Sequence, residues 1–335
     1  MLRSPGGFRG RVSKSPPTRR FLRSPGSVAP VEAPAADDNG FNGHDDSSLR
    51  VDADGHLHRG ARRTLDAHPG PHHATPVIFD GVEHGRGAAH HATLRLVTLN
   101  VAHGRGARFH QTLLRRRTIE GHLTAIATVF DRERPDVVAL QEADGPCTWS
   151  GGFDHVDWLA RNGGFGWHLR GSHVQGRRLD YGTALLSRLE PRDPVAVTFR
   201  PSPPTPSKGF VVATVEHAGH TIDLVSVHLD FSRGRIRRRQ VHELAQVLDG
   251  RDHLRVVMGD LNCDWRERGG TLRLLSDLLG VQPHEPEAHE GHGTFRGRAR
   301  LDWVLTTPSV GVLDYRVLPD RVSDHRAVLA HIQLP

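Results

Sequence analysis

Short apolar segments that each end in a polar residue recur along the second part of the chain. The clearest is 254–262, in which three apolar residues of strand length precede Gly259, and Asp260 and Asn262 follow it. Residues two apart in an extended chain point the same way, so Asp260 and Asn262 can face one substrate. Because ligands of α/β sheets collect at the carboxyl ends of strands, we take this segment as the centre of the predicted site.

The same reasoning along the chain predicts an α/β domain that begins at residue 93. Its first strand, helix and strand form one α/β unit. The proline-rich stretch 201–208 cannot lie inside a sheet and is expected to be a surface loop, and 283–292 is expected to be an acidic, His-rich loop. Alternation and helical spacing predict strands at 94–100, 136–142, 181–188, 210–216, 221–228, 254–259, 301–306 and 327–332, and helices at 111–133, 154–162, about 235–250 and 272–279.

Composition divides the chain into two parts. Residues 1–92 are rich in Pro, Gly, Ser, Ala, His and Asp and contain no long periodic apolar segment, so we expect a disordered, basic and His-rich N-terminal region. Residues 93–335 carry the periodic apolar segments and are expected to form one catalytic domain. With 335 residues and 36% hydrophobic content, the chain can bury a sizeable core.

The net charge of +6 does not by itself indicate a nucleic-acid partner. Residues 1–92 hold 12 basic and 10 acidic side chains and residues 93–335 hold 32 and 28, so the excess in the folded part is small. There is no apolar run of the ~20 residues that a membrane helix needs, and no secretory signal. The two cysteines, Cys147 and Cys263, fit a reducing compartment better than a disulfide framework. We therefore expect a soluble, cytoplasmic, monomeric protein.

Eight polar side chains at strand ends or beginnings form an oxygen-rich set with two imidazoles. Oxygen ligands without a thiolate cluster suit Mg²⁺ or Mn²⁺ better than zinc. Two histidines near such a cation suit phosphoester hydrolysis, one acting on the attacking water and one stabilising charge on the phosphoryl oxygens. The eight residues are Asn100, Glu142, His228, Asp260, Asn262, Asp302, Asp324 and His325.

Seven segments resemble, in order, the motifs of the endonuclease/exonuclease/phosphatase superfamily. The resemblance covers nearly all of residues 93–335. It implies a DNase I-like four-layer α/β sandwich, in which two mixed β-sheets pack face to face with helices outside and the strand-end loops form one catalytic pocket. The segments are Thr98–Asn100, Leu140–Glu142, Tyr181–Arg188, Val227–Leu229, Gly259–Asn262, Leu301–Leu305 and Ser323–His325.

The resemblance also implies roles for the site residues. Glu142, helped by Asn100 and with Asp324 close by, would hold the metal. His325 would be the general base and Asp302 would orient it. The remaining residues act on the substrate: His228 and Asn262 contact the scissile phosphate, Asp260 positions the water or takes part in proton transfer, and Tyr181 is a further phosphate contact.

Departures from the family motifs reduce the number of substrate classes to be considered. Val101 and Ala102 follow Asn100, where abasic-site nucleases carry an Asp, which favours the branch resembling DNase I and sphingomyelinase. Leu301 stands where inositol polyphosphate 5-phosphatases have a Cys. Thr183 replaces a common Asn, which weakens the case for a substrate contact there. In the arginine run at 233–239, Arg237 or Arg239 is expected to reach substrate phosphate, because Arg matches phosphate with a bidentate fork.

The sequence thus predicts a divalent-metal-dependent phosphodiesterase that uses water activated by His325 for in-line attack on phosphorus. The substrate is left open between a nucleic acid, a phospholipid and a small phosphodiester. A sphingomyelin-type or phosphoinositide hydrolase would need an apolar rim. The alternative from another class, a catalytically silent nucleic-acid or partner-binding module, is disfavoured by the intact set of polar residues. Candidates for the apolar rim are Phe153, Trp158, Phe165 and Trp167.

Overall fold

The computed structural model describes residues 92–107, 114–264, 267, 270–284 and 292–335, together with the backbone of two short strands at 72–74 and 77–80. By contacts the chain divides into two compact units, Met1–Thr64 and Leu65–Pro335. The first unit, and with it most of the region predicted to be disordered, lies outside the described residues. The two short strands, β1 (His72–Ala74) and β2 (Val77–Asp80), are not predicted by the sequence pattern.

The second unit contains two mixed sheets of seven strands each. All pairings are antiparallel except β9 with β10 and β3 with β4. One sheet has the order β1, β7 (Arg192–Thr198), β8 (Gly209–His217), β9 (His220–His228), β10 (Leu254–Asp260), β12 (Asp302–Thr306) and β11 (Gln282–Pro283). The other has the order β13 (Gly311–Val317), β14 (Val328–Gln333), β3 (Thr93–Asn100), β4 (Val137–Asp144), β6 (Tyr181–Ser187), β5 (Trp167–Val174) and β2.

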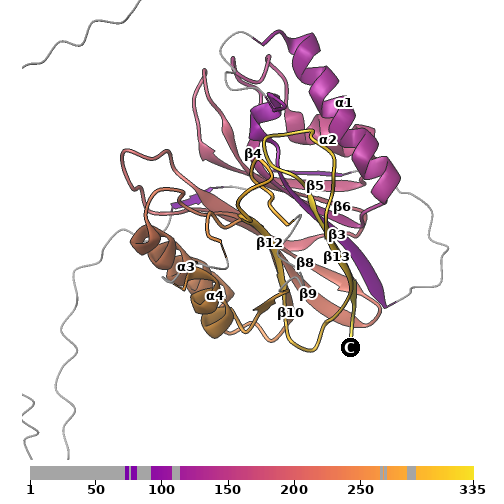
Figure 1. The fold of residues 1–335 in the computed structure, drawn as a ribbon, viewed down its shortest axis with the longest axis vertical. Coiled ribbons are helices and arrows are strands. Elements are labelled where there is room, and N and C mark those ends of the chain that lie inside the picture. Colours follow the sequence, from indigo (N-terminus) through magenta and orange to yellow (C-terminus); the bar gives the residue numbers. More distant parts are fainter. Residues whose placement is uncertain are drawn as a thin grey trace, which may run out of the picture. The chain divides into compact units, whose positions relative to one another are not determined.

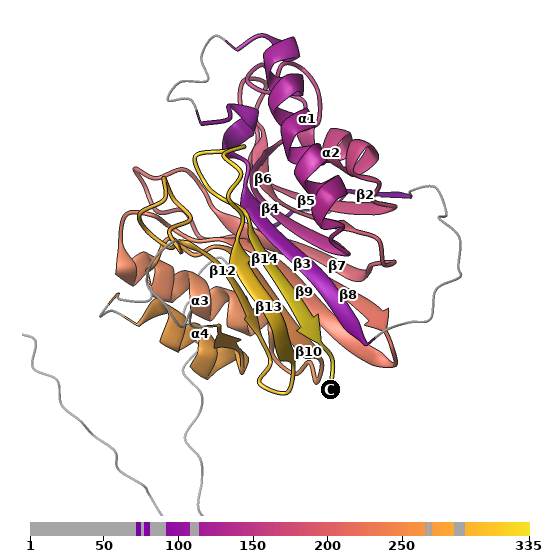
Figure 2. The ribbon, with the colours of Figure 1, turned by 45° about the vertical axis from the view of Figure 1, so that its right-hand side comes forward.

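The helices cover the outer faces of the two sheets (Figures 1 and 2). Helices α1 (Arg116–Glu133) and α2 (His155–Gly163) pack on the sheet that contains β3, and α3 (Gly234–Leu248) and α4 (Thr271–Leu279) pack on the other. A third apolar cluster, with members from both sheets, lies between them. The predicted four-layer, DNase I-like sandwich is therefore confirmed.

Strand alternation determines which side chains lie between the sheets. In β3, Leu94 and Leu96 join the cluster between the sheets, whereas Val97 and Leu99 pack under α1 and α2. Continuing the first series by two residues at a time leads to Thr98 and Asn100. In β9 the series Ile222, Leu224 and Ser226 leads to His228, and in β10 Val256 and Met258 lead to Asp260.

All four helices and most strands lie close to their predicted bounds. Besides β1 and β2, four strands were not predicted: β5, β7, β13 and the two-residue β11, which lies where the loop at 283–292 was expected to begin. Alternation in the three longer ones is weak because β5 carries several polar residues and much of β7 and β13 is exposed. The 201–208 stretch is a loop, as predicted. Over the part of the chain that the structure describes, no helix combines the length and the apolar character needed to cross a membrane.

Candidate active site

Four strand termini, three from one sheet and one from the other, meet at one point. His228 and Asp260 are register partners at the ends of the parallel strands β9 and β10, and Asp302 pairs with Asp260 at the start of β12. From the other sheet, Asn100 at the end of β3 donates from Nδ2 to Asp260 Oδ2 at 3.0 Å. These residues adjoin a pocket of about 440 Å³ whose lining includes Glu142, Tyr181, Lys208, His228, Asp260, Asn262, Asp324 and His325.

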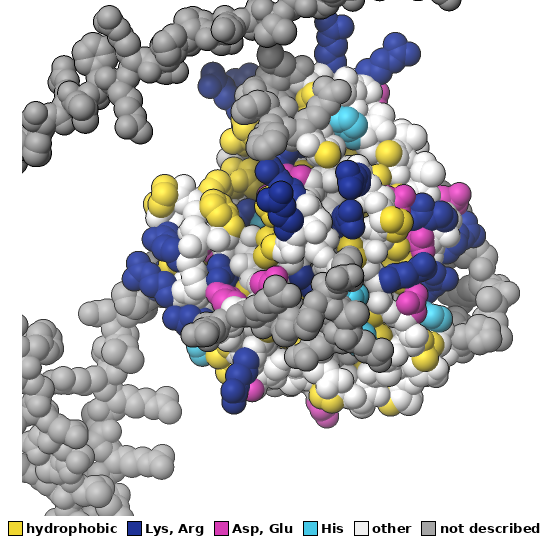
Figure 3. Space-filling view, viewed as in Figure 1, with side chains coloured by type: hydrophobic (Ala, Val, Ile, Leu, Met, Phe, Trp, Pro, Cys, Tyr) yellow, Lys and Arg dark blue, Asp and Glu magenta, His cyan; other side chains and the backbone are white. Residues whose placement is uncertain are grey.

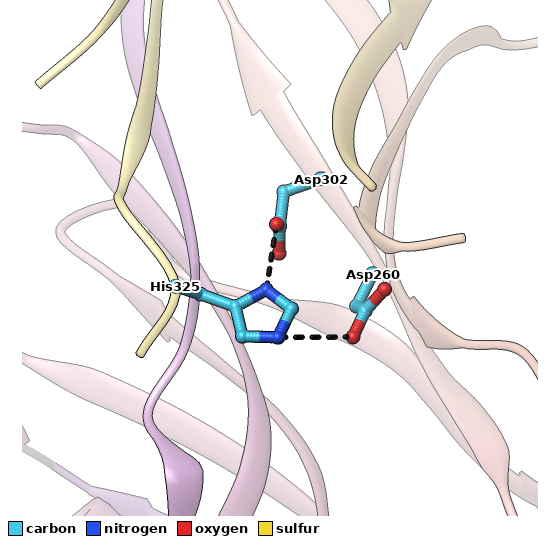
Figure 4. A group of neighbouring side chains, drawn as sticks. All are labelled: Asp260, Asp302 and His325. Carbon is cyan, nitrogen blue, oxygen red and sulfur yellow. Dashed lines mark hydrogen bonds and ion pairs between the residues drawn. The ribbon is translucent and has the colours of Figure 1, made fainter. Parts of the chain in front are cut away.

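The imidazole of His325 lies between two carboxylates (Figure 4). Its Nδ1 is 2.7 Å from Asp302 Oδ2, and its Nε2 is 3.8 Å from Asp260 Oδ2. The second separation is too long for a hydrogen bond and is one that a water molecule can bridge. Asp302 and His325 are both nearly inaccessible to solvent, so the ring is held in one orientation by a buried partner.

Burial and charge shift the pKa values in this group strongly. Burial alone would lower the pKa of His325, but Asp302 and Asp260 outweigh it and raise that pKa to about 10. Burial raises the pKa of Asp260 to about 7, and the neighbouring Asp302 adds to the effect. Asp260 and His325 are therefore a coupled pair that can take up or release a proton near neutral pH.

Asp260 is fixed by its neighbours on both carboxylate oxygens. Besides the bond from Asn100, the backbone N–H of Asn262 donates to Asp260 Oδ1 at 3.0 Å. Asn262 has a positive φ of 49°, and its Nδ2 donates to the Leu229 carbonyl at 3.0 Å. The sequence prediction that Asp260 and Asn262 face one pocket agrees with this placement, although β10 continues through Gly259 to Asp260 instead of ending at the glycine.

Glu142 reaches the pocket because of a β-bulge. The pairing of β4 with β6 shifts between Gln141 and Ala143, and Glu142 takes a φ of 50°. Regular alternation would place Glu142 opposite Gln141, whose amide donates to Ser226 in the other sheet at 3.2 Å. The bulge re-aims the carboxylate toward the pocket.

Positive groups surround the Glu142 carboxylate. His103 Nε2 lies 3.3 Å from Oε2, Lys208 Nζ lies 3.9 Å from Oε1, and Arg105 Nη1 lies 3.9 Å from Oε2. Burial would raise the pKa of Glu142, but these charges hold it well below its usual range. Glu142 is therefore ionised throughout the neutral range.

Lys208 is the site residue that sequence reasoning missed most clearly. It ends the proline-rich loop, is 7% exposed, and places Nζ 3.4 Å from His228 Nδ1. Burial lowers the pKa of Lys208, and burial together with Lys208 lowers the pKa of His228 well below 6.5. The only signal in the sequence is a lysine next to a strand that pairs with the strand ending in His228.

His103 was also missed. Its Nδ1 lies 2.7 Å from Asp144 Oδ1, and this partner raises the pKa of His103 against the opposing effect of burial. The ring also contacts the Tyr181 ring edge-on, with centroids 4.6 Å apart. His103 stands three residues after Asn100 and Asp144 two after Glu142, so proximity to the two motifs was the available signal.

Arg105 connects two of the predicted metal-site residues. Its guanidinium donates to Asp324 Oδ2 at 2.6 Å and lies near Glu142. Ser323 ties the same segment to β3, because its hydroxyl donates to the Asn100 carbonyl at 2.7 Å. The segment before β14 is thus anchored beside the end of β3.

Two other groups of predicted residues do not line this pocket. Arg237 is buried on α3, where its guanidinium bonds to Glu267 and to the Asp230 carbonyl. Arg239 donates to the Arg200 carbonyl at 2.8 Å. These arginines are therefore engaged away from the place expected for substrate phosphate.

The prediction of an apolar rim is also wrong, because most of its residues pack against the core under α1 and α2. Phe165 is buried in the cluster under α1 and α2, and Phe153 and Trp158 pack against that cluster. Trp167 lies on β5, at a separate hollow. The apolar rings at the pocket that contains Asp260 belong instead to Tyr181, Phe231 and Phe295, of which Phe231 is 59% exposed.

The oxygen donors of the pocket fit a hard divalent cation. The Glu142 and Asp324 carboxylates both contact the Arg105 guanidinium, so the two acids already face one positive group. Both polar atoms of the Asn100 side chain are already engaged: Nδ2 donates to Asp260, and Oδ1 accepts from the Ala102 N–H at 3.0 Å. Asp260, Asp302 and His325 also lie close enough to share an ion.

A DNase I-like sandwich whose strand ends gather these carboxylates, amides and imidazoles defines a phosphoester hydrolase. Residues 97–325 match the Endonuclease/Exonuclease/phosphatase family, and the chain belongs to that family, whose members hydrolyse phosphoesters and are generally dependent on divalent metals. None of the curated proteins compared with the chain matches its sequence.

Several solved structures share the fold. An endonuclease/exonuclease/phosphatase from Beutenbergia cavernae is 22% identical, with 72% of each chain covered and a TM-score of 0.55. The mannosyl-6-phosphatase of Bacteroides thetaiotaomicron is 13% identical over 71% of this chain and 99% of its own, with a TM-score of 0.56. The human Nocturnin catalytic domain with bound sulfate is 16% identical over 78% and 98%, with a TM-score of 0.53.

Proposed function

We propose that this protein is a divalent-metal-dependent phosphodiesterase that activates water with the Asp260 and His325 pair. The observation that carries the proposal is the alignment of Asp302, His325 and Asp260 at the edge of a pocket that also holds Glu142. Glu142 and Asp324, with Asn100 beside them, would hold Mg²⁺ or Mn²⁺. When bound, such a cation polarises the phosphoryl oxygens and offsets their charge.

The base in this proposal is the pair, because His325 alone is largely protonated at neutral pH. A water placed between His325 Nε2 and Asp260 Oδ2 gives its proton to the pair as its oxygen forms the new bond to phosphorus. Asp302 holds the imidazole in orientation through Nδ1. The bond from phosphorus to the leaving oxygen breaks on the opposite side, as in-line displacement requires.

Charge that develops on the phosphoryl oxygens is stabilised by groups on the other side of the pocket. Lys208 supplies a buried positive charge next to His228, and Asn262 contributes an amide. Buried donors aimed at developing charge act in a low-dielectric setting and are effective there. Tyr181 lies at the same wall, with its pKa raised to about 12 by burial and by Glu142, and therefore acts as a neutral hydrogen-bond donor.

The first test is His325→Ala assayed with bis(p-nitrophenyl) phosphate in Mg²⁺, in Mn²⁺ and in EDTA. We expect turnover by the unaltered protein only with metal, and a fall in kcat on the order of 10²- to 10⁴-fold in the variant. His242→Ala, an exposed histidine on α3, serves as the matched control. Equal turnover in His325→Ala and in the control would exclude this mechanism.

The natural substrate class is a separate measurement. A panel of DNA, RNA, sphingomyelin, phosphoinositides and cyclic nucleotides, each with Mg²⁺, Mn²⁺ and no metal, distinguishes a nuclease from a lipid or small-phosphodiester hydrolase. A nuclease is expected to lose affinity steeply with salt. Binding of one of these compounds without turnover would instead support a catalytically silent binding module.

A further inference from the structure

A second hollow adjoins the catalytic pocket. Its volume is about 300 Å³, and it shares Arg296 and Asp324 with the lining of the catalytic pocket. Arg321 and Arg326 complete its polar lining together with Ser323. A substrate bound at the catalytic pocket therefore has a neighbouring space into which a second group can extend.

Arginine side chains predominate among the charged residues that line this hollow. Three arginines line it against one carboxylate, that of Asp324, which Arg105 already contacts at 2.6 Å. Neither Arg321 nor Arg326 forms an ion pair with a carboxylate in the described ranges. On the face drawn in Figure 3, Lys and Arg side chains are interspersed with Asp and Glu.

Two backbone segments hold the arginines together. The Arg296 N–H donates to the Asp324 carbonyl at 2.9 Å, and the Arg326 N–H donates to the Thr294 carbonyl at 2.9 Å. These reciprocal bonds join the turn at 294–299 to the segment before β14, which also carries His325. The guanidinium of Arg296 lies over the Phe295 ring, 5.1 Å from its centroid, and that ring contacts His325. The positions of the arginines are thus tied to the position of the catalytic histidine.

We propose that Arg296, Arg321 and Arg326 form a second anion subsite, which binds a further phosphate group of the substrate next to the scissile phosphodiester. This inference rests on the proposed function. Guanidinium groups match phosphate oxygens with paired hydrogen bonds, and three of them offset the charge of a second phosphate. The second phosphate can be a terminal monoester or the next phosphodiester of a polynucleotide.

Three p-nitrophenyl phosphodiesters separate these sources. The first, the p-nitrophenyl ester of thymidine 5′-phosphate, has one phosphate; the second carries an added 3′-phosphate; the third has a second nucleotide joined through a 3′-phosphodiester. We expect the unaltered protein to have a higher kcat/KM for the probes with two phosphates. In Arg321→Gln/Arg326→Gln, the advantage of these probes over the first is expected to fall about 10- to 100-fold.

The control is Arg298→Gln, which removes an exposed arginine from the same turn but outside the hollow. It should keep the preference for two phosphates. A preference lost only for the monoester probe assigns the subsite to a terminal phosphate, and a loss for both probes assigns it to a strand. No preference in the unaltered protein, or an equal loss for all three probes, would overturn the proposal.

A binding measurement keeps this inference distinct from the proposed hydrolysis. Titration calorimetry in EDTA compares thymidine 3′,5′-bisphosphate with thymidine 5′-phosphate on the unaltered protein and on the double variant. Tighter binding of the bisphosphate that is lost in the variant supports the subsite even if no diester is hydrolysed. Equal affinities for the two nucleotides in both proteins would contradict it.

Discussion

At the scale of the residue, the charge of the pocket depends on a lysine that no motif contains. Lys208 is buried and lies near both Glu142 and His228, with Nζ 3.9 Å from Glu142 Oε1 and 3.4 Å from His228 Nδ1. Its Nζ offsets part of the Glu142 charge, and burial together with this neighbouring positive charge lowers the pKa of His228, so the imidazole is neutral. Burial and Lys208 together therefore keep His228 uncharged, and Lys208 is one of several positive groups, with His103 and Arg105, that keep Glu142 ionised.

Lys208→Gln is therefore expected to lower kcat for bis(p-nitrophenyl) phosphate about 10²-fold or more, with a smaller change in KM. The reason is that the positive charge matters most when charge develops on the phosphoryl oxygens. Steady-state kinetics with a thermal unfolding control checks this. A change confined to KM would show that Lys208 only assists substrate binding.

His173 gives a residue-scale prediction for stability. Burial, with the charges of Lys208 and Arg170, lowers its pKa from 6.5 to about 3, and its ring nitrogens contact Thr183 and Thr198. Below pH 6.5 the His173 side chain becomes protonated in the unfolded chain, whereas in the folded protein it is protonated only near pH 3. This contribution to stability is fully present above pH 6.5 and is lost as pH falls.

The free energy of unfolding should consequently fall by up to about 1.4 kcal/mol per pH unit from this group below pH 6.5. Urea unfolding at several pH values between 7 and 4 measures the slope. His173→Gln should have a shallower slope than the unaltered protein, since glutamine does not titrate. Identical slopes would mean that His173 is not the buried neutral group described here.

At the scale of the element, β10 depends on a glycine just before Asp260. Gly259 has a φ of 151°, and a methyl group there would overlap the carbonyl oxygen of Val227 in the neighbouring β9. The strand that carries Asp260 and the strand that carries His228 can approach closely only because this side chain is absent.

Gly259→Ala is expected to reduce the free energy of unfolding by about 3 kcal/mol, because the strand must shift or β9 must move. Urea denaturation measures the change. Gly121→Ala is the matched control: Gly121 lies in α1, a Cβ there meets nothing within 4 Å, and the change should stabilise the protein by about 1 kcal/mol. Similar effects of the two substitutions would contradict the close approach.

At the scale of the whole molecule, the site exists only where the two sheets meet. Asn100 comes from one sheet and Asp260 from the other, and Gln141 and Ser226 form a second polar link between the same layers. Separation of the sheets would therefore break the candidate site and the central core together. Buried side chains elsewhere should become accessible to solvent when the sheets separate.

The reactivity of the two cysteine thiols measures this exposure. Cys147 and Cys263 are both buried and free, and burial raises the pKa of the Cys263 thiol. We expect no reaction with Ellman's reagent at pH 8 in the folded protein and reaction of both thiols in denaturant. The urea dependence of labelling should follow that of unfolding measured by circular dichroism. Rapid labelling without urea would show that the layers open locally.

The sequence by itself determined the two faces of each strand and therefore much of the site. A period of two is a local property, so the series through Leu96, Thr98 and Asn100 already fixes which residues share a face. The same rule applies to the strands that end in His228 and Asp260. The layer order, by contrast, was implied by the resemblance of the motifs to a known family.

Only the tertiary structure decided those features of the site that depend on contacts between residues far apart in the sequence. Three examples depend on a partner far away in the sequence: the bulge that directs Glu142 into the pocket, the burial of Lys208, and the hydrogen bond from Arg237 to Glu267. The aromatic residues expected at the rim pack into the core for the same reason. Periodicity constrains a side chain relative to its own strand or helix, whereas the packing of separate elements determines which charge or ring it meets.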